Sequence, residues 1–231
     1  MPNYIQNRLA FEGSPEDIVA LRVAIAGSYD DPLDNSIRVI DFKKIVPIPG
    51  SLSVAYDYDV LKCALFMATG DKMWEPFAHQ LWPKDFTADQ WALFLSYIQN
   101  IRDHGAPNDG RWVLVNWGSR NGYWFDESRE PGAIYFTTDW SPCLPVVRAL
   151  SRQHPNVMIR YDYAGTDDTA GRWMFSGGEG AEIQFVDDQE KNEFGIRLQF
   201  PRATAVEIRR MGYDEEFNYV GEPAEDGDDN Q

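Results

Sequence analysis

Cys143 and the carboxylates Asp139 and Asp162 come closest to the residues of a catalytic site. Cys143 follows a proline at an expected helix start, where the helix dipole lowers the pKa of a thiol, and it would act with a histidine brought to it by the fold. Asp139 and Asp162 would work as an acid and a base beside Trp140, which would stack on a sugar. The alternative is that Asp139 caps the helix expected at 141–153 and that Asp162 faces solvent. Because no further catalytic group accompanies either set, we predict no catalytic residues and no enzyme activity.

The sequence also predicts no metal site and no cofactor. The three histidines do not lie at ligand spacing from one another or from a cysteine. The acidic pairs Asp57 with Asp59 and Asp167 with Asp168 lack the spaced loop with a closing Glu that binds calcium. The segment Gly177–Gly180 lacks the lysine, serine or threonine of a phosphate-binding loop, and it is typical of a hairpin turn.

The elements that must position these residues are typical of an α+β protein. Period-two alternation and turn residues predict strands at 4–11, 36–42, 112–117, 133–138, 157–163, 172–176, 181–186 and 194–200. Capping residues predict helices that begin at Ser14 and Ser141, and a short one at 203–211. We expect a ferredoxin-like fold, with a mainly antiparallel sheet and helices on one face.

The stretch 51–110 has a different character from the rest of the chain. Thr87 and Gln90 form a capping box, and the apolar residues from Trp91 to Ile101 follow at helical spacing. We therefore expect a helical insertion at 51–110 within a single α+β domain of residues 1–213.

The charge is strongly acidic and unevenly distributed. The net charge is -16, from 37 acidic and 21 basic residues, and residues 214–231 hold eight acids and no Lys or Arg. We expect this tail to be disordered. Residues 111–163 are locally basic, with six arginines against five acids. The sequence has no apolar run of membrane length and no signal-peptide pattern, and it has only two cysteines, so we expect a cytoplasmic location and no membrane contact.

Several short segments together resemble a known family. They are Met1–Tyr4 with Asn7–Leu9 and Gly13, Asp41–Pro49, Asn116–Gly118, Thr138–Pro142, Leu150–Ser151, Pro155 and Tyr161–Tyr163. Over most of residues 1–180 the combination resembles the YubB-like proteins of plasmids and phages, whose C-terminal part is classed as a ferredoxin-like domain. The resemblance implies a protein of a mobile element and supplies no catalytic residues. The family usually continues Asn-Trp-Gly with a Thr-Lys-Trp-like segment, and Ser119–Trp124 departs from it.

From the resemblance and the charge we expect a non-enzymatic interaction protein that binds and inhibits a basic host protein, such as a nucleic-acid-binding defence complex. Carboxylates would compete for the Lys and Arg side chains that otherwise bind phosphates, and aromatics of the 117–124 loop would anchor the contact. The candidate binding residues are Trp117, Arg120, Tyr123, Trp124, Asp139, Trp140, Asp167, Asp168, Asp214, Glu215 and Glu216.

A second hypothesis is a single-stranded nucleic-acid-binding module. A ferredoxin-like sheet can stack bases on aromatic side chains, and the locally basic residues 111–163 include Trp117, Trp124, Trp140, Tyr161 and Tyr163. The net charge of the whole molecule opposes this hypothesis, because an acidic surface repels phosphates.

Overall fold

The structure is a computed structural model that describes residues 3–28, 37–38, 40–70, 83–119, 122–125, 130–166 and 169–221. The chain divides into two compact units. A sheet unit is formed by Met1–Ile45 with Asn121–Gln231, and a helical unit by Val46–Arg120. The helical unit contains the whole of the expected insertion at 51–110 and extends beyond it at both ends.

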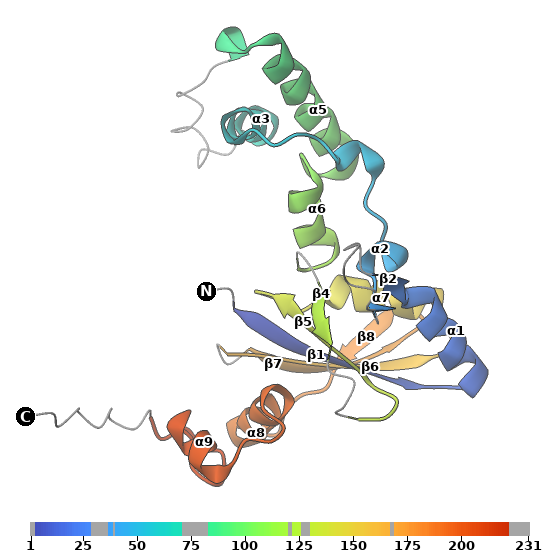
Figure 1. The fold of residues 1–231 in the computed structure, drawn as a ribbon, viewed down its shortest axis with the longest axis vertical. Coiled ribbons are helices and arrows are strands. Elements are labelled where there is room, and N and C mark those ends of the chain that lie inside the picture. Colours follow the sequence, from blue (N-terminus) through green and yellow to red (C-terminus); the bar gives the residue numbers. More distant parts are fainter. Residues whose placement is uncertain are drawn as a thin grey trace, which may run out of the picture. The chain divides into compact units, whose positions relative to one another are not determined.

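A six-stranded sheet in the order β4-β5-β1-β6-β7-β8 forms the centre of the sheet unit, and all its neighbouring strands are antiparallel (Figure 1). The strands are β1 Tyr4–Glu12, β4 Gly122–Phe125, β5 Ile134–Asp139, β6 Met158–Gly165, β7 Ala170–Ser176 and β8 Glu179–Glu182. The fold is ferredoxin-like, as the sequence predicts. The glycine turn between β7 and β8 is confirmed, since Gly177 and Gly178 have φ values of 59° and 89°, which suit a tight hairpin.

One face of the sheet carries the main core. Alternate residues of β1 and β6 are fully buried there, among them Ile5, Leu9, Ile159 and Tyr161. Helices α1 (Pro15–Ile25) and α7 (Leu144–Gln153) lie over this face (Figure 1). The Ser14 side chain caps α1 by accepting a hydrogen bond from Asp17 N, as expected for a Ser-Pro start. After α1, the short strands β2 (Gly27–Ser28) and β3 (Ile37–Arg38) form a separate antiparallel pair, and α2 (Phe42–Ile45) follows.

The prediction of a strand at 194–200 is wrong. These residues belong to helix α8 (Asp188–Gln199), whose start is capped by Asp187. The apolar residues that alternate along the sequence also fit helical spacing, because Phe194 and Leu198 lie one turn apart. Both pack with Ala164 of β6 on the sheet face opposite α7. This face is therefore covered in part by α8 (Figure 1).

The prediction of a strand at 112–117 is also wrong. Helix α6 (Asp109–Asn116) occupies this segment, because the Asn108 side chain accepts a hydrogen bond from Arg111 N and begins a helix. The expected strand at 36–42 is reduced to the two residues of β3.

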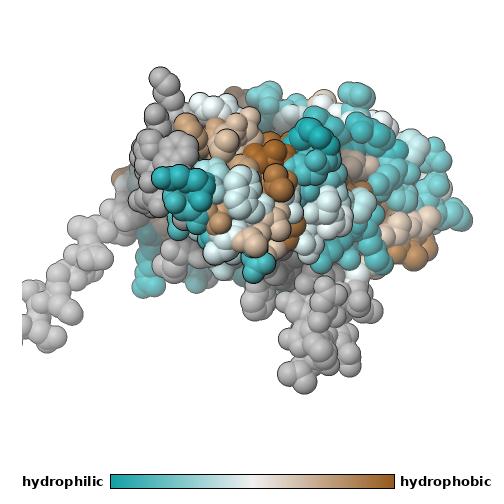
Figure 2. Space-filling view, turned by 90° about the horizontal axis from the view of Figure 1, so that it is seen from above, coloured by the Kyte–Doolittle hydropathy of each residue, from teal (hydrophilic) through white to brown (hydrophobic). Residues whose placement is uncertain are grey.

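The helical unit is built on a core between two helices. Its elements are η1 Gly50–Leu52, α3 Tyr58–Thr69, η3 Pro83–Asp85, α5 Ala88–His104 and α6. The capping box of Thr87 and Gln90 is confirmed at the start of α5. Val60, Ala64 and Tyr97 are fully buried between α3 and α5. In the view of Figure 2, exposed apolar side chains form small groups between hydrophilic ones.

The C-terminal end of the sheet unit corrects the prediction that all of 214–231 is disordered. Helix α9 (Ala205–Arg210) is followed by a folded turn, in which Phe217 is buried against Ile196 and Ile208. Tyr213 and Tyr219 pair across this turn. Residues 222–231 lie outside the described residues. Among the helices of the described ranges, none is long and apolar enough to cross a membrane.

Candidate binding surface at the end of β5

Strand β5 ends in a strained corner at Trp140. Its φ is 66°, in the left-handed region that a bulky residue rarely adopts, and its side chain is 63% exposed. The backbone is held by two hydrogen bonds: Trp140 N donates to Asn3 O at 2.7 Å, and Ser141 N donates to Asp139 O at 2.8 Å. The fold thus fixes an exposed indole in an unfavourable backbone conformation.

A buried polar network holds this corner from beneath. Asn7 of β1 is fully buried, and its Nδ2 donates to Thr138 Oγ1 at 3.1 Å and to Ile5 O at 2.9 Å. Its Oδ1 accepts a hydrogen bond of 2.6 Å from the Tyr161 hydroxyl. The hydroxyl of Thr138 in turn donates to Ser141 O at 2.8 Å. The chain on both sides of Trp140 is therefore tied to the same side chains.

The far end of the corner is tied to the network through Cys143. Its backbone N–H donates to the Tyr161 hydroxyl at 2.9 Å, and its Sγ lies 3.6 Å from the same oxygen. Burial raises the pKa of Cys143 to about 12 and raises that of Tyr161 well above its ordinary value. The thiol is fully buried and protonated. This corrects the idea that a helix start lowers its pKa, and Cys143 is a structural residue.

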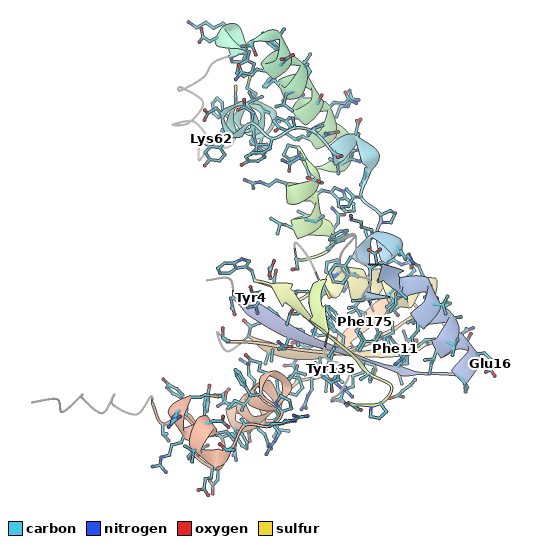
Figure 3. The ribbon with its side chains drawn as sticks, in the orientation of Figure 1. Tyr4, Phe11, Glu16, Lys62, Tyr135 and Phe175 are labelled. Atoms are coloured by element: carbon cyan, nitrogen blue, oxygen red, sulfur yellow. The ribbon has the colours of Figure 1, made fainter. Side chains whose placement is uncertain are left out.

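Asp139 and Tyr4 are the chain and sheet neighbours of this corner, since Asp139 directly precedes Trp140 and Trp140 N donates to the carbonyl of Asn3, next to Tyr4. The two residues are partners in the β1–β5 register, and Tyr4 is 47% exposed near the N-terminal end of β1 (Figure 3). We call Tyr4, Asp139 and Trp140 the aromatic corner. An indole and a phenol next to a carboxylate can receive a cationic side chain, since aromatic faces attract cations and the carboxylate accepts their hydrogen bonds.

The structure separates the two carboxylates that were considered as an acid–base pair. Asp139 is opposite Tyr4 of β1, whereas Asp162 is opposite Arg8. Four residues along β1 correspond to about 13 Å, and the two strands are themselves about 10 Å apart across β1. This distance exceeds hydrogen-bond reach, so the two do not act on one substrate bond.

Asp162 does not face solvent either, because it is only 2% exposed. It accepts a hydrogen bond of 2.7 Å from Arg8 Nη1 and one of 3.2 Å from Arg160 Nε. Arg8 also forms a two-pronged ion pair with Glu130, which accepts a hydrogen bond from the Tyr135 hydroxyl. The hydrogen bond from Arg8 holds the pKa of Glu130 below its ordinary value. This cluster neutralises the sheet face beside α8, and its charges satisfy one another.

The other predicted binding residues are scattered. Trp117 is a core residue of the helical unit: it is 4% exposed, its Nε1 donates to Val46 O at 2.9 Å, and its ring packs edge-on against Trp112. Trp117 is therefore not the exposed anchor that was expected from the sequence. Tyr123 and Trp124 belong to strand β4 rather than to a loop, with Tyr123 opposite Thr137 of β5. Arg120, Asp167 and Asp168 lie outside the described residues.

The acidic residues after α9 have divided roles. Asp214 is structural, because its carboxylate accepts hydrogen bonds from the backbone N–H groups of Glu216 and Asn218. The hydrogen bond from the Asn218 side chain lowers the pKa of Asp214. Glu215 and Glu216 are exposed. Nothing in the geometry joins these residues to the aromatic corner.

The stacking platform of the second hypothesis loses two of its aromatics, since Trp117 and Tyr161 are buried. Tyr163 lies over Gly171, where a Cβ would come within 2.4 Å of its ring, so it serves cross-strand packing. Of the proposed platform residues whose side chains the structure describes, Trp140 is the exposed one.

Sequence reasoning missed Asn7 and Tyr161 as the supports of the corner. A signal was present, because asparagine is depleted in strand interiors and Asn7 stands between the apolar residues of a predicted strand. Such a residue indicates a buried hydrogen-bond network, whereas the left-handed backbone of Trp140 has no sequence signal.

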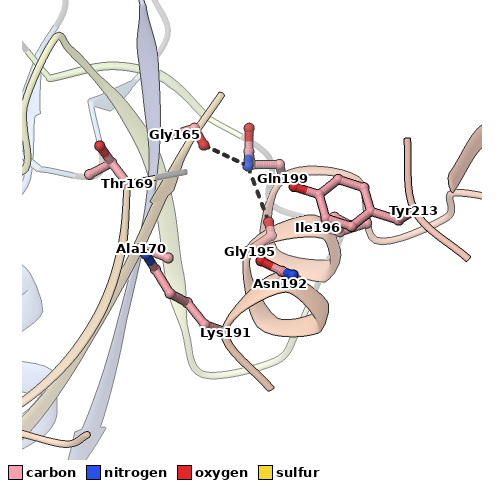
Figure 4. Close-up of a pocket in the computed structure, with 9 residues that line it drawn as sticks. All are labelled: Gly165, Thr169, Ala170, Lys191, Asn192, Gly195, Ile196, Gln199 and Tyr213. Carbon is pink, nitrogen blue, oxygen red and sulfur yellow. Dashed lines mark hydrogen bonds between the residues drawn. The ribbon is translucent and has the colours of Figure 1, made fainter. Parts of the chain in front are cut away.

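Two further features, possible metal ligands and a small cavity beside α8, add nothing to this surface. Within the described ranges, no group of three or more His, Cys, Asp or Glu residues lies close enough to hold a metal ion. A cavity of about 30 Å³ lies between β7 and α8, and it is lined by Thr169, Lys191 and Tyr213 among others (Figure 4). Gln199 Nε2 donates to Gly165 O at 3.0 Å at its edge. This volume suits a water molecule.

Comparisons with known proteins support the fold. Residues 120–203 match the family model described as the ferredoxin-like domain in Api92-like protein. This range holds β4 to β8 with α7 and α8, whereas the central strand β1 comes from outside it. No curated protein matches.

Among solved structures, the crystal structure of the protein api92 from Yersinia pseudotuberculosis is similar, with a TM-score of 0.31 and 11% identity. The similarity covers 81% of this chain and all of that one. The family match names Api92-like proteins. The resemblance to YubB-like proteins remains an expectation. Three of the segments that carry this resemblance, those containing Asn7, Trp140 and Tyr161, meet at the aromatic corner and its network.

Proposed function

We propose that this chain is a non-enzymatic interaction protein that binds a basic partner protein, with the aromatic corner as its anchor. The observation that carries the proposal is the exposed Trp140 in a left-handed conformation, held by a fully buried network. Backbone strain of this kind costs about 1–3 kcal/mol and persists where the surrounding structure imposes it. Because the indole packs little in its own unit, the conformation is best explained by a contact with another molecule.

The chemistry of the corner suits a Lys or Arg side chain. A cation over an indole contributes about 0.5–2 kcal/mol, more when water is excluded, and Asp139 supplies the opposite charge. Tryptophan is also among the residues that most often dominate binding energy at interfaces. The corner therefore fits a basic side chain presented next to an apolar one.

The charge of the molecule supports the same class of partner. A net charge of -16 raises the local concentration of cationic surfaces and speeds their association. The exposed Glu215 and Glu216 add to this field. In this proposal the acidic surface governs the rate of encounter, and the aromatic corner governs how long the complex lasts.

The biological setting is part of the proposal. The resemblance to YubB-like proteins supports a phage- or plasmid-encoded protein that acts in the bacterial cytoplasm. A basic host defence protein that itself binds nucleic acid is the partner we propose, and its inhibition would follow from occupation of its phosphate-binding Lys and Arg residues.

Affinity capture tests the proposal. The full chain is immobilised and exposed to bacterial lysate, with and without nuclease treatment, and compared with Trp140→Ala and Tyr56→Ala. Tyr56 is a matched control, because it is 68% exposed and belongs to the helical unit. We expect the unaltered chain to retain a basic protein after nuclease treatment. Trp140→Ala should retain at least about tenfold less of this protein, and Tyr56→Ala should retain as much as the unaltered chain.

Two outcomes contradict the proposal. Equal retention by Trp140→Ala and the unaltered chain would remove the corner from the interface, and a flat response to added salt would remove the electrostatic mechanism. If nucleic acid is recovered from the untreated lysate alone, the single-stranded nucleic-acid-binding module becomes the better description.

A further inference from the structure

The outer face of α7 forms a second surface, with chemistry opposite to that of the aromatic corner. A shallow groove of about 330 Å³ is lined by Leu144, Pro145, Arg148, Ala149 and Arg152, which we call the α7 groove. We infer that the α7 groove binds an acidic peptide segment of a partner protein, with an apolar side chain near the start of α7 and two carboxylates on the arginines.

The helix presents this face because its other face is buried in the sheet unit. Val146, Val147 and Leu150 have at most 1% exposure. Positions 144–145, 148–149 and 152 recur at helical spacing and form one outward stripe. The groove therefore has an apolar end and a basic end along a single rigid helix.

The basic end is held in place by the β7–β8 hairpin. Gly178 N donates to Ser151 Oγ at 3.2 Å, which ties the last turn of α7 to this hairpin. The Arg152 side chain packs on the same turn, because a Cβ on Gly178 would come within 3.0 Å of Arg152 Cβ and Nε. Since the stem of Arg152 rests on backbone, little side-chain freedom is lost when its guanidinium binds a ligand.

The two arginines have no ion-pair partner among the described residues. In the same unit Arg8, Arg160, Arg172 and Arg197 all pair with carboxylates. Arg202 and Arg209 also form no ion pair among the described residues, but Arg148 and Arg152 are the ones that line a groove. The positive charge of the groove fits an anionic occupant.

The spacing of the groove selects an extended acidic peptide. Arg148 and Arg152 lie one helical turn apart, about 6 Å, and alternate side chains of an extended peptide are about 7 Å apart on one side. A peptide of the pattern Leu-x-Glu-x-Glu therefore places its leucine over Leu144 and Pro145 and its carboxylates on the two arginines. Nucleic acid would use the charges alone and leave the apolar end unoccupied.

Fluorescence anisotropy with a labelled peptide Leu-Ser-Glu-Ser-Glu tests the inference. The full chain is compared with the double variant Arg148→Glu, Arg152→Glu and with the control Arg202→Glu, Arg209→Glu. The control makes the same charge change at exposed positions just before and within α9, a helix that lies on the other side of the sheet in Figure 1. We expect the unaltered chain and the control to bind the peptide saturably. The groove variant, Arg148→Glu with Arg152→Glu, should lose at least about tenfold in affinity. The unaltered chain should lose a similar amount when the peptide carries Gln in place of Glu or Ser in place of Leu.

Several results would overturn the inference. They are the absence of peptide binding at low salt, equal binding by the groove variant, and binding of an oligothymidylate in place of the peptide. A chain ending at residue 221 is compared with the full chain. If only the shorter chain binds the peptide, the occupant of the groove is the acidic segment 222–231 and not a partner protein. The groove variant leaves Trp140 intact. A failure of the peptide-binding inference can therefore be distinguished from a failure of the proposal that the aromatic corner binds a basic protein.

Discussion

Trp140 and Phe217 share an uncommon backbone conformation in opposite surroundings. They are the two non-glycine residues with positive φ in the part of the chain that the structure describes, at 66° and 63°. Phe217 is 7% exposed, packs with Ile196 and Ile208, and lies 5.1 Å below the guanidinium of Arg197. Trp140 is 63% exposed.

The contrast shows where each strain is offset. The burial of a phenylalanine side chain contributes about 1.5–3 kcal/mol, which is enough to offset the cost of about 1–2 kcal/mol for one left-handed residue. At Phe217 the fold itself therefore supplies the compensation. At Trp140 the buried network below the chain imposes the left-handed conformation, and the exposed indole gains little burial energy. In our proposal the backbone strain is therefore offset by contact with a bound partner.

The largest expected effect comes from the network under Trp140. Asn7→Leu removes the acceptor of the Tyr161 hydroxyl and the donor to Thr138, so we expect the free energy of unfolding to fall by about 3 kcal/mol. Urea denaturation measures this loss, and hydrogen exchange at the Trp140 amide should accelerate more than that at Phe217. Gln6→Leu is the control, since Gln6 is on the opposite sheet face, and it should change stability by less than about 0.5 kcal/mol. If Asn7→Leu changes neither the free energy of unfolding nor hydrogen exchange at the Trp140 amide, the network does not hold the corner.

Phe217→Gly should lower the free energy of unfolding by about 2 kcal/mol, because lost burial outweighs relieved strain. Thermal and urea unfolding check the value. Binding of the basic partner should stay unchanged. A gain in stability would show that the strain at Phe217 is not offset by its own packing.

Trp140→Gly should act in the opposite way. Relief of the left-handed conformation stabilises the fold, and the greater freedom of glycine in the unfolded chain opposes it, so we expect a net gain of about 0.5 kcal/mol. Retention of the basic partner should be lost at the same time. Trp140→Ala keeps the strain and should lose binding without this gain, which separates the indole from the backbone.

The smallest effect is a difference in pH response. The pKa of Asp214 lies below its ordinary value of 3.8 because of the hydrogen bond from Asn218, so the carboxylate stabilises the Phe217 turn above the unfolded-state pKa. This stabilisation is lost as the pH falls through the lower, folded-state value. Asn7, Thr138 and Tyr161 carry no charge in this range. As the pH is lowered from 5 to 2, the Phe217 amide should therefore lose its protection from hydrogen exchange before the Trp140 amide does. Asp214→Asn should abolish this pH response.

Local signals predicted much of the fold, and tertiary packing decided the rest. Caps and turns at Ser14, Thr87 and Gly177 are confirmed, because these residues satisfy nearby backbone groups wherever the chain lies. The prediction of a strand at 194–200 was wrong, because Phe194 and Leu198 fit both strand and helix periodicity and the Asp187 cap favours the helix.

The candidate site was less predictable. Asp139 and Trp140 were named from their residue types. The burial of Trp117 depends on Val46, which is distant in sequence, and the pairing of Asp162 with Arg8 depends on β1. Such contacts have no local pattern that would indicate them.

The central position of β1 has a consequence for the order of folding. Asn7 and Thr138, which hydrogen-bond across the β1–β5 pair, are separated by 131 residues of chain, and the whole helical unit lies between them. As the chain leaves the ribosome, β1 emerges before β5 and β6 and lacks both of its sheet partners until they are made. The helical unit can form its α3–α5 core in that interval from local contacts alone. Sheet closure is therefore expected to be the slow step, and until it occurs an unpaired β1 is the segment that needs protection from aggregation.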